Sequence, residues 1–130
     1  MILARRALLL LLALPTAACT RDTMLLESDI PLPRGMQTVR SADIRRSAGT
    51  VSGGTFLLSG EVEDARSCVD LAATRFAAYG WKLVTTEGDA NVARASFAKD
   101  SRTAALSLRR RALDPVMSTG SLEVQAAASP

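Results

Sequence analysis

The chain has 130 residues, with 16 lysines and arginines against 13 aspartates and glutamates, two cysteines and no histidine. This length allows one domain with one modest core. The lack of histidine removes the commonest metal ligand and the commonest general base near neutral pH. Arg5 and Arg6 lie in an 18-residue leader without acidic residues, so the net charge falls from +3 to +1 without it. We therefore expect no catalytic residues, no metal, no cofactor and no nucleic-acid partner.

Residues 1–18 have the three parts of a secretory signal peptide. Arg5 and Arg6 form a basic start, residues 7–14 an apolar run, and residues 16–18 a small-residue exit. At about 1.5 Å per residue the apolar run covers about 12 Å of a hydrocarbon core that is about 30 Å thick. The pattern therefore favours a cleaved signal over a membrane-spanning anchor.

Cys19 directly follows these small residues. The run Thr16-Ala17-Ala18-Cys19 resembles the lipobox of bacterial lipoproteins. The resemblance implies that Cys19 is lipidated and anchors the chain to a membrane, and Thr20, which is not aspartate, implies the periplasmic face of the outer membrane. Ordinary cleavage after Ala18 is the alternative; it would give a soluble periplasmic protein in which a Cys19–Cys68 disulfide becomes possible.

Residues 19–35 mix polar residues with Pro31, Pro33 and Gly35. Each proline fixes its own backbone and favours an extended residue before it. One interpretation is a tether that lifts the domain from the membrane. The other is an extended arm that packs along the domain edge through Met24, Leu25, Leu26 and Ile30. The pattern leaves both open.

A single domain is expected over residues 36–126, with a tail at 127–130. Within residues 36–50, Met36, Val39 and Ile44 could belong to a first strand, but small and glycine residues at 47–49 and 52–54 interrupt the pattern, so a strand is left open there. Residues 55–62 alternate, which predicts a strand with Phe56, Leu58 and Val62 on the core face.

Glycines flank and interrupt this strand. Gly60 lies inside the alternating pattern, which indicates a bulge or the close approach of another backbone. Ser52-Gly53-Gly54 precedes the strand without the lysine of a phosphate-binding loop, so it predicts a hairpin turn.

Residues 64–79 form the predicted helix, with Asp64 as N-cap and Gly80 as the stop. Apolar residues at helical spacing form one core-facing stripe. Cys68 lies in this stripe and has no histidine to activate it, so we expect a buried, inert thiol. The stripe comprises Ala65, Cys68, Val69, Ala72, Phe76 and Tyr79.

Four further strands are predicted at residues 81–86, 91–99, 103–111 and 121–125, joined by short turns. Strands joined in this way must be antiparallel. We therefore predict an α+β fold with one antiparallel sheet of four to five strands and a single helix packed on one face. The expected inward residues of these strands are Trp81, Leu83, Ala93, Ala95, Phe97, Ala104, Leu106, Leu108, Leu122 and Val124.

Two charged groups are candidate sites. Glu61, Glu63 and Asp64 lack the loop spacing of a calcium site and are expected to solvate and cap the helix start. In the run 109–111, alternate residues of a strand face opposite sides, so Arg109 and Arg111 should share the open sheet face with Arg94. That face could bind lipid headgroups or lipopolysaccharide phosphates. A strand protected from aggregation by its charge is the alternative.

Several segments resemble a small α+β domain of uncharacterised bacterial lipoproteins, over about residues 31–125. They are residues 31–35, 55–60, 79–83 and 97–99, of which Gly80-Trp81 is the most recognisable step. The resemblance implies an anchored periplasmic module and supplies no catalytic residues. We expect a non-enzymatic lipoprotein with an interaction or accessory role, anchored in the membrane through its N-terminal lipid, with other envelope proteins as partners. The alternative is a binding domain for an anionic envelope ligand that uses Arg94, Arg109 and Arg111.

Overall fold

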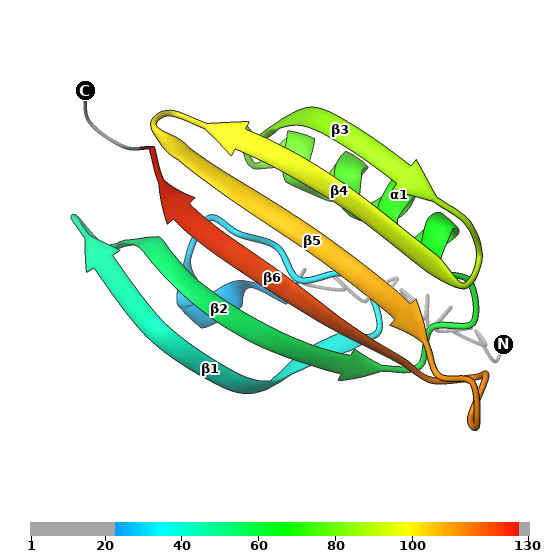
Figure 1. Cartoon of the computed structure of the whole chain (residues 1–130). Helices are drawn as coiled ribbons and strands as arrows, with labels where there is room; N and C mark the ends of the chain where they lie inside the picture. Colours follow the sequence, from blue (N-terminus) through cyan, green and yellow to red (C-terminus); the bar gives the residue numbers. More distant parts are fainter. Residues whose placement is uncertain (1–22, 128–130) are drawn as a thin grey trace, which may run out of the picture.

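The computed structural model describes residues 23–127. One antiparallel six-stranded sheet, in the order β1-β2-β6-β5-β4-β3, carries one helix, α1, on one face (Figure 1). The α+β class, the single antiparallel sheet and the single helix are confirmed, whereas the predicted four to five strands are too few. The elements are η1 (Leu25–Glu27), β1 (Met36–Ser47), β2 (Thr50–Gly60), α1 (Ala65–Ala78), β3 (Lys82–Gly88), β4 (Val92–Lys99), β5 (Arg102–Arg110) and β6 (Ser118–Ala126).

β1 covers the segment in which the sequence pattern left a first strand open. Its register against β2 shifts at three points between Thr38 and Arg46, and each such irregularity changes which face the following side chains occupy. Met36 is its single buried residue. An edge strand with bulges and no buried face has no period of two in its sequence.

The hairpin turn between β1 and β2 lies at Ala48 and Gly49, so the turn predicted at residues 52–54 is wrong. Ala48 has φ 50° and Gly49 has φ 80°, the pair of positive values that a two-residue type I′ turn requires. Gly54 instead lies inside β2, where an added Cβ would lie 3.0 Å from the Phe56 ring. This glycine therefore allows ring packing inside a strand.

The helix boundaries match the prediction closely. The Asp64 carboxylate accepts a hydrogen bond from the Ser67 backbone N–H at 3.0 Å, and Gly80 follows the helix with φ 88°. The predicted stripe is buried except for Tyr79, which is half-buried as the C-cap residue. α1 contacts β4, β3 and β5.

An aromatic cluster fills the space between helix and sheet. The Phe76 ring stacks on Phe97 with centroids 4.0 Å apart and meets the Trp81 ring edge-on at 5.8 Å. The predicted inward residues of β4, β5 and β6 are all buried. Leu83 is the exception at 41% exposed, because β3 is an edge strand whose register shifts between Leu83 and Thr85.

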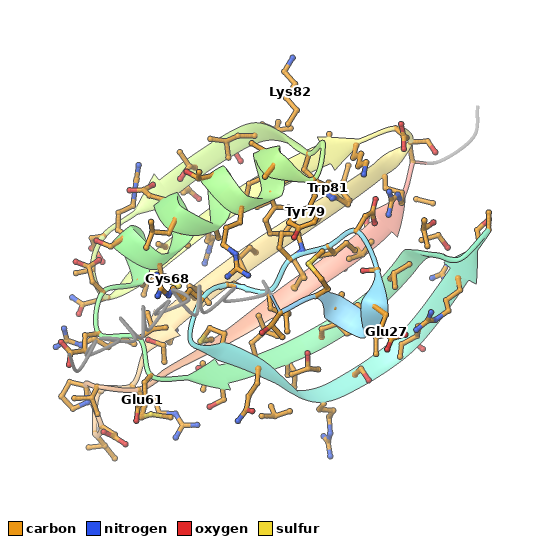
Figure 2. All side chains as sticks on the ribbon, turned by 180° about the vertical axis from the view of Figure 1, so that it is seen from behind. Glu27, Glu61, Cys68, Tyr79, Trp81 and Lys82 are labelled. Carbon is orange, nitrogen blue, oxygen red and sulfur yellow. The ribbon has the colours of Figure 1, made fainter. Side chains whose placement is uncertain are left out.

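Residues 23–35 form an arm that packs on the same sheet face as α1 and beside it (Figures 1 and 2). Leu25, Ile30 and Leu32 are buried in the common core, and Met24 pairs with Pro31 in an isolated bridge. Of the two arrangements open for this stretch, its described part adopts the packed one. The arm covers sheet surface that the helix does not reach.

The end of the arm crosses the end of β2 closely. An added Cβ at Gly60 would clash with the Gly35 carbonyl and lie 2.9 Å from the Met36 Cα. The predicted close approach of another backbone at Gly60 is therefore confirmed. It fixes where the arm turns into β1.

Candidate functional site

Cys68 is buried on the inner side of α1. Its Sγ lies 3.9 Å from the Arg34 carbonyl oxygen, and burial raises the pKa of the thiol to about 11. The thiol therefore stays protonated at neutral pH and does not act as a thiolate nucleophile there. The predicted buried cysteine is confirmed.

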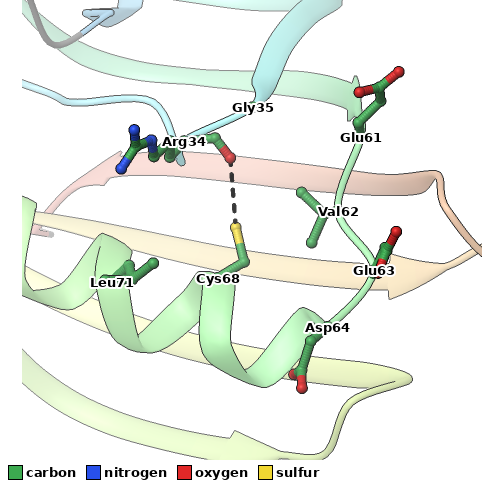
Figure 3. A pocket seen from close by; sticks show the side chains of 8 residues that line it. All are labelled: Arg34, Gly35, Glu61, Val62, Glu63, Asp64, Cys68 and Leu71. Atoms are coloured by element: carbon green, nitrogen blue, oxygen red, sulfur yellow. Dashed lines mark hydrogen bonds between the residues drawn. The ribbon is translucent and has the colours of Figure 1, made fainter. Parts of the chain in front are cut away.

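A shallow hollow of about 370 Å³ borders Cys68 at the start of the helix (Figure 3). The carboxylates of Glu61, Glu63 and Asp64 line it but point in different directions. Within residues 23–127, no group of three His, Cys, Asp or Glu side chains is arranged to hold a metal ion. Asp64 serves as the helix cap, as predicted.

The sheet face opposite α1 brings together the three arginines that the sequence singled out. Arg94 lies opposite Ser107 in the β4–β5 pair, and Arg109 is two residues further along, so their Cα atoms are diagonal neighbours roughly 7–8 Å apart. Arg111 follows β5, and its Nη2 donates to the Ser59 hydroxyl at 3.5 Å. Ser59 lies on the same row of the sheet as Arg109. The predicted common face is therefore present.

Positive charge is concentrated at one end of this face. Arg94 lies opposite Glu87 in β3, whereas Arg109 lies opposite Val92 in β4 and Thr119 in β6. Arg110 points to the other face, where its Nη1 donates to a backbone carbonyl at 3.3 Å, that of Glu63. The three consecutive arginines thus surround one end of β5 from both faces.

We call this region the arginine end; it comprises Asn91, Val92 and residues 109–111. Together with Ala112 and Pro115 these residues line a hollow of about 300 Å³. Among the residues that the structure describes, none of the three arginines takes part in an ion pair. Their charges are therefore available to an anion.

The β5–β6 loop, residues 111–117, projects next to the arginine end. The Met117 N–H donates to the Asp114 carbonyl at 2.9 Å, and the Arg111 N–H donates to the Met117 carbonyl at 2.8 Å, so a β-turn with proline at its second position orders the loop. Leu113 is fully exposed at 101%, and Val116 is exposed at 49%. The sequence indicated only a short turn between the strands predicted at residues 103–111 and 121–125, because nothing in a short loop pattern predicts which apolar side chains stay outside.

A charged cluster that sequence reasoning missed holds the arm. The Asp29 carboxylate accepts from Lys99 Nζ at 2.7 Å and from Arg102 Nη1 and Nη2 at 2.9 and 2.6 Å. The guanidinium of Arg102 also lies 4.9 Å from the centre of the Trp81 ring. The Trp81 indole N–H donates to the Asp29 backbone carbonyl at 2.9 Å, and Lys99 Nζ donates to the Tyr79 carbonyl at 2.7 Å. We call these five residues the arm clamp.

The arm clamp has strong electrostatic effects on its members. The hydrogen bonds from Arg102, and then the one from Lys99, hold the pKa of Asp29 well below its usual range. Asp29 in turn raises the pKa of Arg102. Asp29 and Arg102 therefore stay charged at neutral pH, so this ion pair fixes the arm in place.

Comparisons with protein-family models, with curated proteins and with solved structures found no match. No helix within residues 23–127 is long and apolar enough to cross a membrane. The predicted signal peptide and the predicted lipidation site at Cys19 lie outside the described residues, as do residues 128–130 of the tail. Function is therefore inferred from the leader sequence together with the geometry of the domain.

Proposed function

We propose that this chain is a non-enzymatic lipoprotein of the bacterial envelope, anchored through a lipidated Cys19, whose domain acts as an interaction or accessory module. The observation that carries the proposal is the order of parts in the leader: two arginines, an apolar run, small residues and a cysteine. Thr20 favours the outer membrane by resemblance to bacterial lipoproteins. The expected partners are other envelope proteins.

The arm supports this proposal by limiting the distance between anchor and domain. The packed arm begins at Thr23, four residues after Cys19, and four extended residues span at most about 14 Å. A lipid on Cys19 would therefore hold the domain against the membrane surface. The buried Cys68 thiol has its own place in the core, which leaves Cys19 as the cysteine available for modification.

Labelling with radioactive palmitate tests the anchor. We expect the full chain to incorporate label and to fractionate with outer membranes. The Cys19→Ala variant should lose the label and move to the soluble periplasmic fraction, because the acyl chains are gone. The matched variant Cys68→Ala should keep both label and location. A parent chain without label, or label that survives Cys19→Ala, would contradict the proposal.

A second candidate function is binding of an anionic envelope ligand by Arg94, Arg109 and Arg111. It is favoured by their common face and by the lack of ion pairs to these arginines within the described residues. Guanidinium groups recognise phosphate oxygens in bidentate fashion. The ligand class would be a lipid headgroup or a lipopolysaccharide phosphate.

Measuring the affinity of the chain for lipopolysaccharide tests this second candidate function. We expect Arg109→Ala to weaken binding about fivefold, since one arginine near an anionic surface contributes about 1 kcal/mol, and we expect added salt to weaken it further. Arg66→Ala is the matched control, because Arg66 lies on α1 and pairs with Asp70 at 3.1 Å. If neither Arg109→Ala nor added salt changes the affinity for lipopolysaccharide, this function is excluded.

A further inference from the structure

Exposed apolar side chains occur at the β5–β6 loop together with arginines that form no ion pair within residues 23–127. A single exposed leucine on a protein surface is ordinary. Here Leu113 and Val116 project from an ordered turn directly beside the arginine end. Apolar side chains flanked by basic ones are typical of segments that enter the interface of an anionic bilayer.

We propose that the β5–β6 loop contacts an anionic phospholipid bilayer, with Leu113 and Val116 entering the headgroup boundary and the arginine end binding phosphate groups. The hollow of about 300 Å³ at the root of the loop, lined by residues 109–111, lies where a headgroup phosphate would meet guanidinium groups. Phosphate oxygens suit the fork of an arginine. The loop would thus place apolar side chains at its tip and phosphate-binding arginines at its root.

The arginines of the arginine end form no ion pair with the acidic residues around them in the described part of the chain. The loop itself has one acidic residue, Asp114, against three arginines in residues 109–111. Glu61, Glu63 and Asp64 lie on the neighbouring β2–α1 connection, and Asp89 lies in the β3–β4 turn at the same end of the sheet. None of these carboxylates pairs with Arg109, Arg110 or Arg111 within the described part of the chain. The positive charge of the arginine end is therefore not cancelled by an ion pair in the fold.

The start of the arm lies within reach of the sheet end that carries this loop. The Leu32 N–H donates to the Thr23 carbonyl at 2.8 Å, so the start of the arm lies beside Leu32, and four residues from there to Met36 span at most about 14 Å. Met36 pairs with Gly60, and Gly60 pairs with Ser118, the first residue after the loop. This step rests on the proposed lipid at Cys19, which would hold the domain close enough to the membrane for the loop to reach it.

A bilayer fits the loop better than an acidic protein does. An acidic partner would be recognised by the arginines, but it gives no reason for a fully exposed leucine beside them. A bilayer takes up both, because its phosphates lie outside its acyl chains. An acidic protein partner is therefore an outcome that the test must separate.

Fluorescence quenching at two labelled positions tests the proposal. The full chain, with Cys68→Ala, carries an environment-sensitive fluorophore at Leu113→Cys or, as the matched control, at Ser101→Cys in the turn at the opposite end of β5. The probe is a vesicle of phosphatidylglycerol and phosphatidylcholine that contains a lipid-borne quencher. We expect quenching at position 113 to be several-fold stronger than at position 101. Arg109→Gln, high salt, or vesicles of phosphatidylcholine alone should reduce it, because each removes attraction to phosphate.

The possible outcomes distinguish the proposed loop contact from the proposed lipid anchor. Equal quenching at positions 113 and 101, with the chain sedimenting on the vesicles, overturns the loop contact and leaves the lipid anchor standing. A chain that stays in the supernatant overturns both. Equal quenching at positions 113 and 101, together with crosslinking of position 113 to an envelope protein, assigns the loop to a protein partner and overturns the bilayer contact. Palmitate labelling, followed separately, reports on Cys19 alone.

Discussion

At the scale of single residues, the Asp29 carboxylate ties the arm to two basic side chains of the sheet. One carboxylate accepts hydrogen bonds from both Lys99 and Arg102, and Arg102 is 8% exposed beneath the arm. A buried guanidinium that loses its partner is strongly destabilising. The fit of the arm therefore depends on one charge as well as on its apolar side chains.

We expect Asp29→Asn to lower the free energy of unfolding by about 3 kcal/mol, because the variant leaves Arg102 buried without a carboxylate. Urea unfolding measures the loss. Trp81, the chain's one tryptophan, should show red-shifted fluorescence as the arm loosens above its ring. The matched control is Asp70→Asn, which breaks the exposed Arg66–Asp70 pair and should cost less than about 1 kcal/mol. Equal losses in the two variants would exclude a stabilising clamp.

At the scale of elements, the sequence predicts those strands that bury one face. In β5 the predicted inward series Ala104, Leu106 and Leu108 is confirmed, and α1 is identified by its stripe and its cap. Extending the alternating β5 series by two residues also places Arg102 on the inward face. The alternation of the strand therefore predicts that Arg102, a member of the arm clamp, is buried. Asp29 is not predictable as its partner, because the two residues are 73 positions apart and no local rule joins them.

The elements that the sequence pattern misses differ physically from those that it predicts. β1 buries a single residue and has bulges, so its side chains follow no regular alternation. The arm has no repeating hydrogen-bond pattern with the sheet, and its buried side chains follow no helical or strand period. The arginines are predicted on the correct face, because strand parity decides that. The exposure of Leu113 depends on how the loop folds, which composition alone does not fix.

At the scale of the whole molecule, the arm clamp couples stability to pH. The folded pKa of Asp29 lies below its ordinary value of 3.8, so the folded state binds this proton less readily than the unfolded state does. The contribution of Asp29 is therefore fully present above about pH 5 and is lost as the pH falls through the ordinary value towards the lowered one. Asp89, whose pKa is lowered by the backbone N–H groups of Val92 and Asn91, acts in the same direction.

We expect the free energy of unfolding of the parent chain to fall between about pH 5 and pH 2. In Asp29→Asn the fall should be shallower, because the amide does not titrate and Asp89 remains as a source of acid dependence. Urea unfolding at a series of pH values measures both slopes. Parallel slopes for the parent and the variant would mean that the arm is not held by the Asp29 charge. If the clamp works as the geometry indicates, the two curves lie furthest apart at neutral pH and approach each other in acid, because protonation removes from the parent the same charge that the substitution removes from the variant.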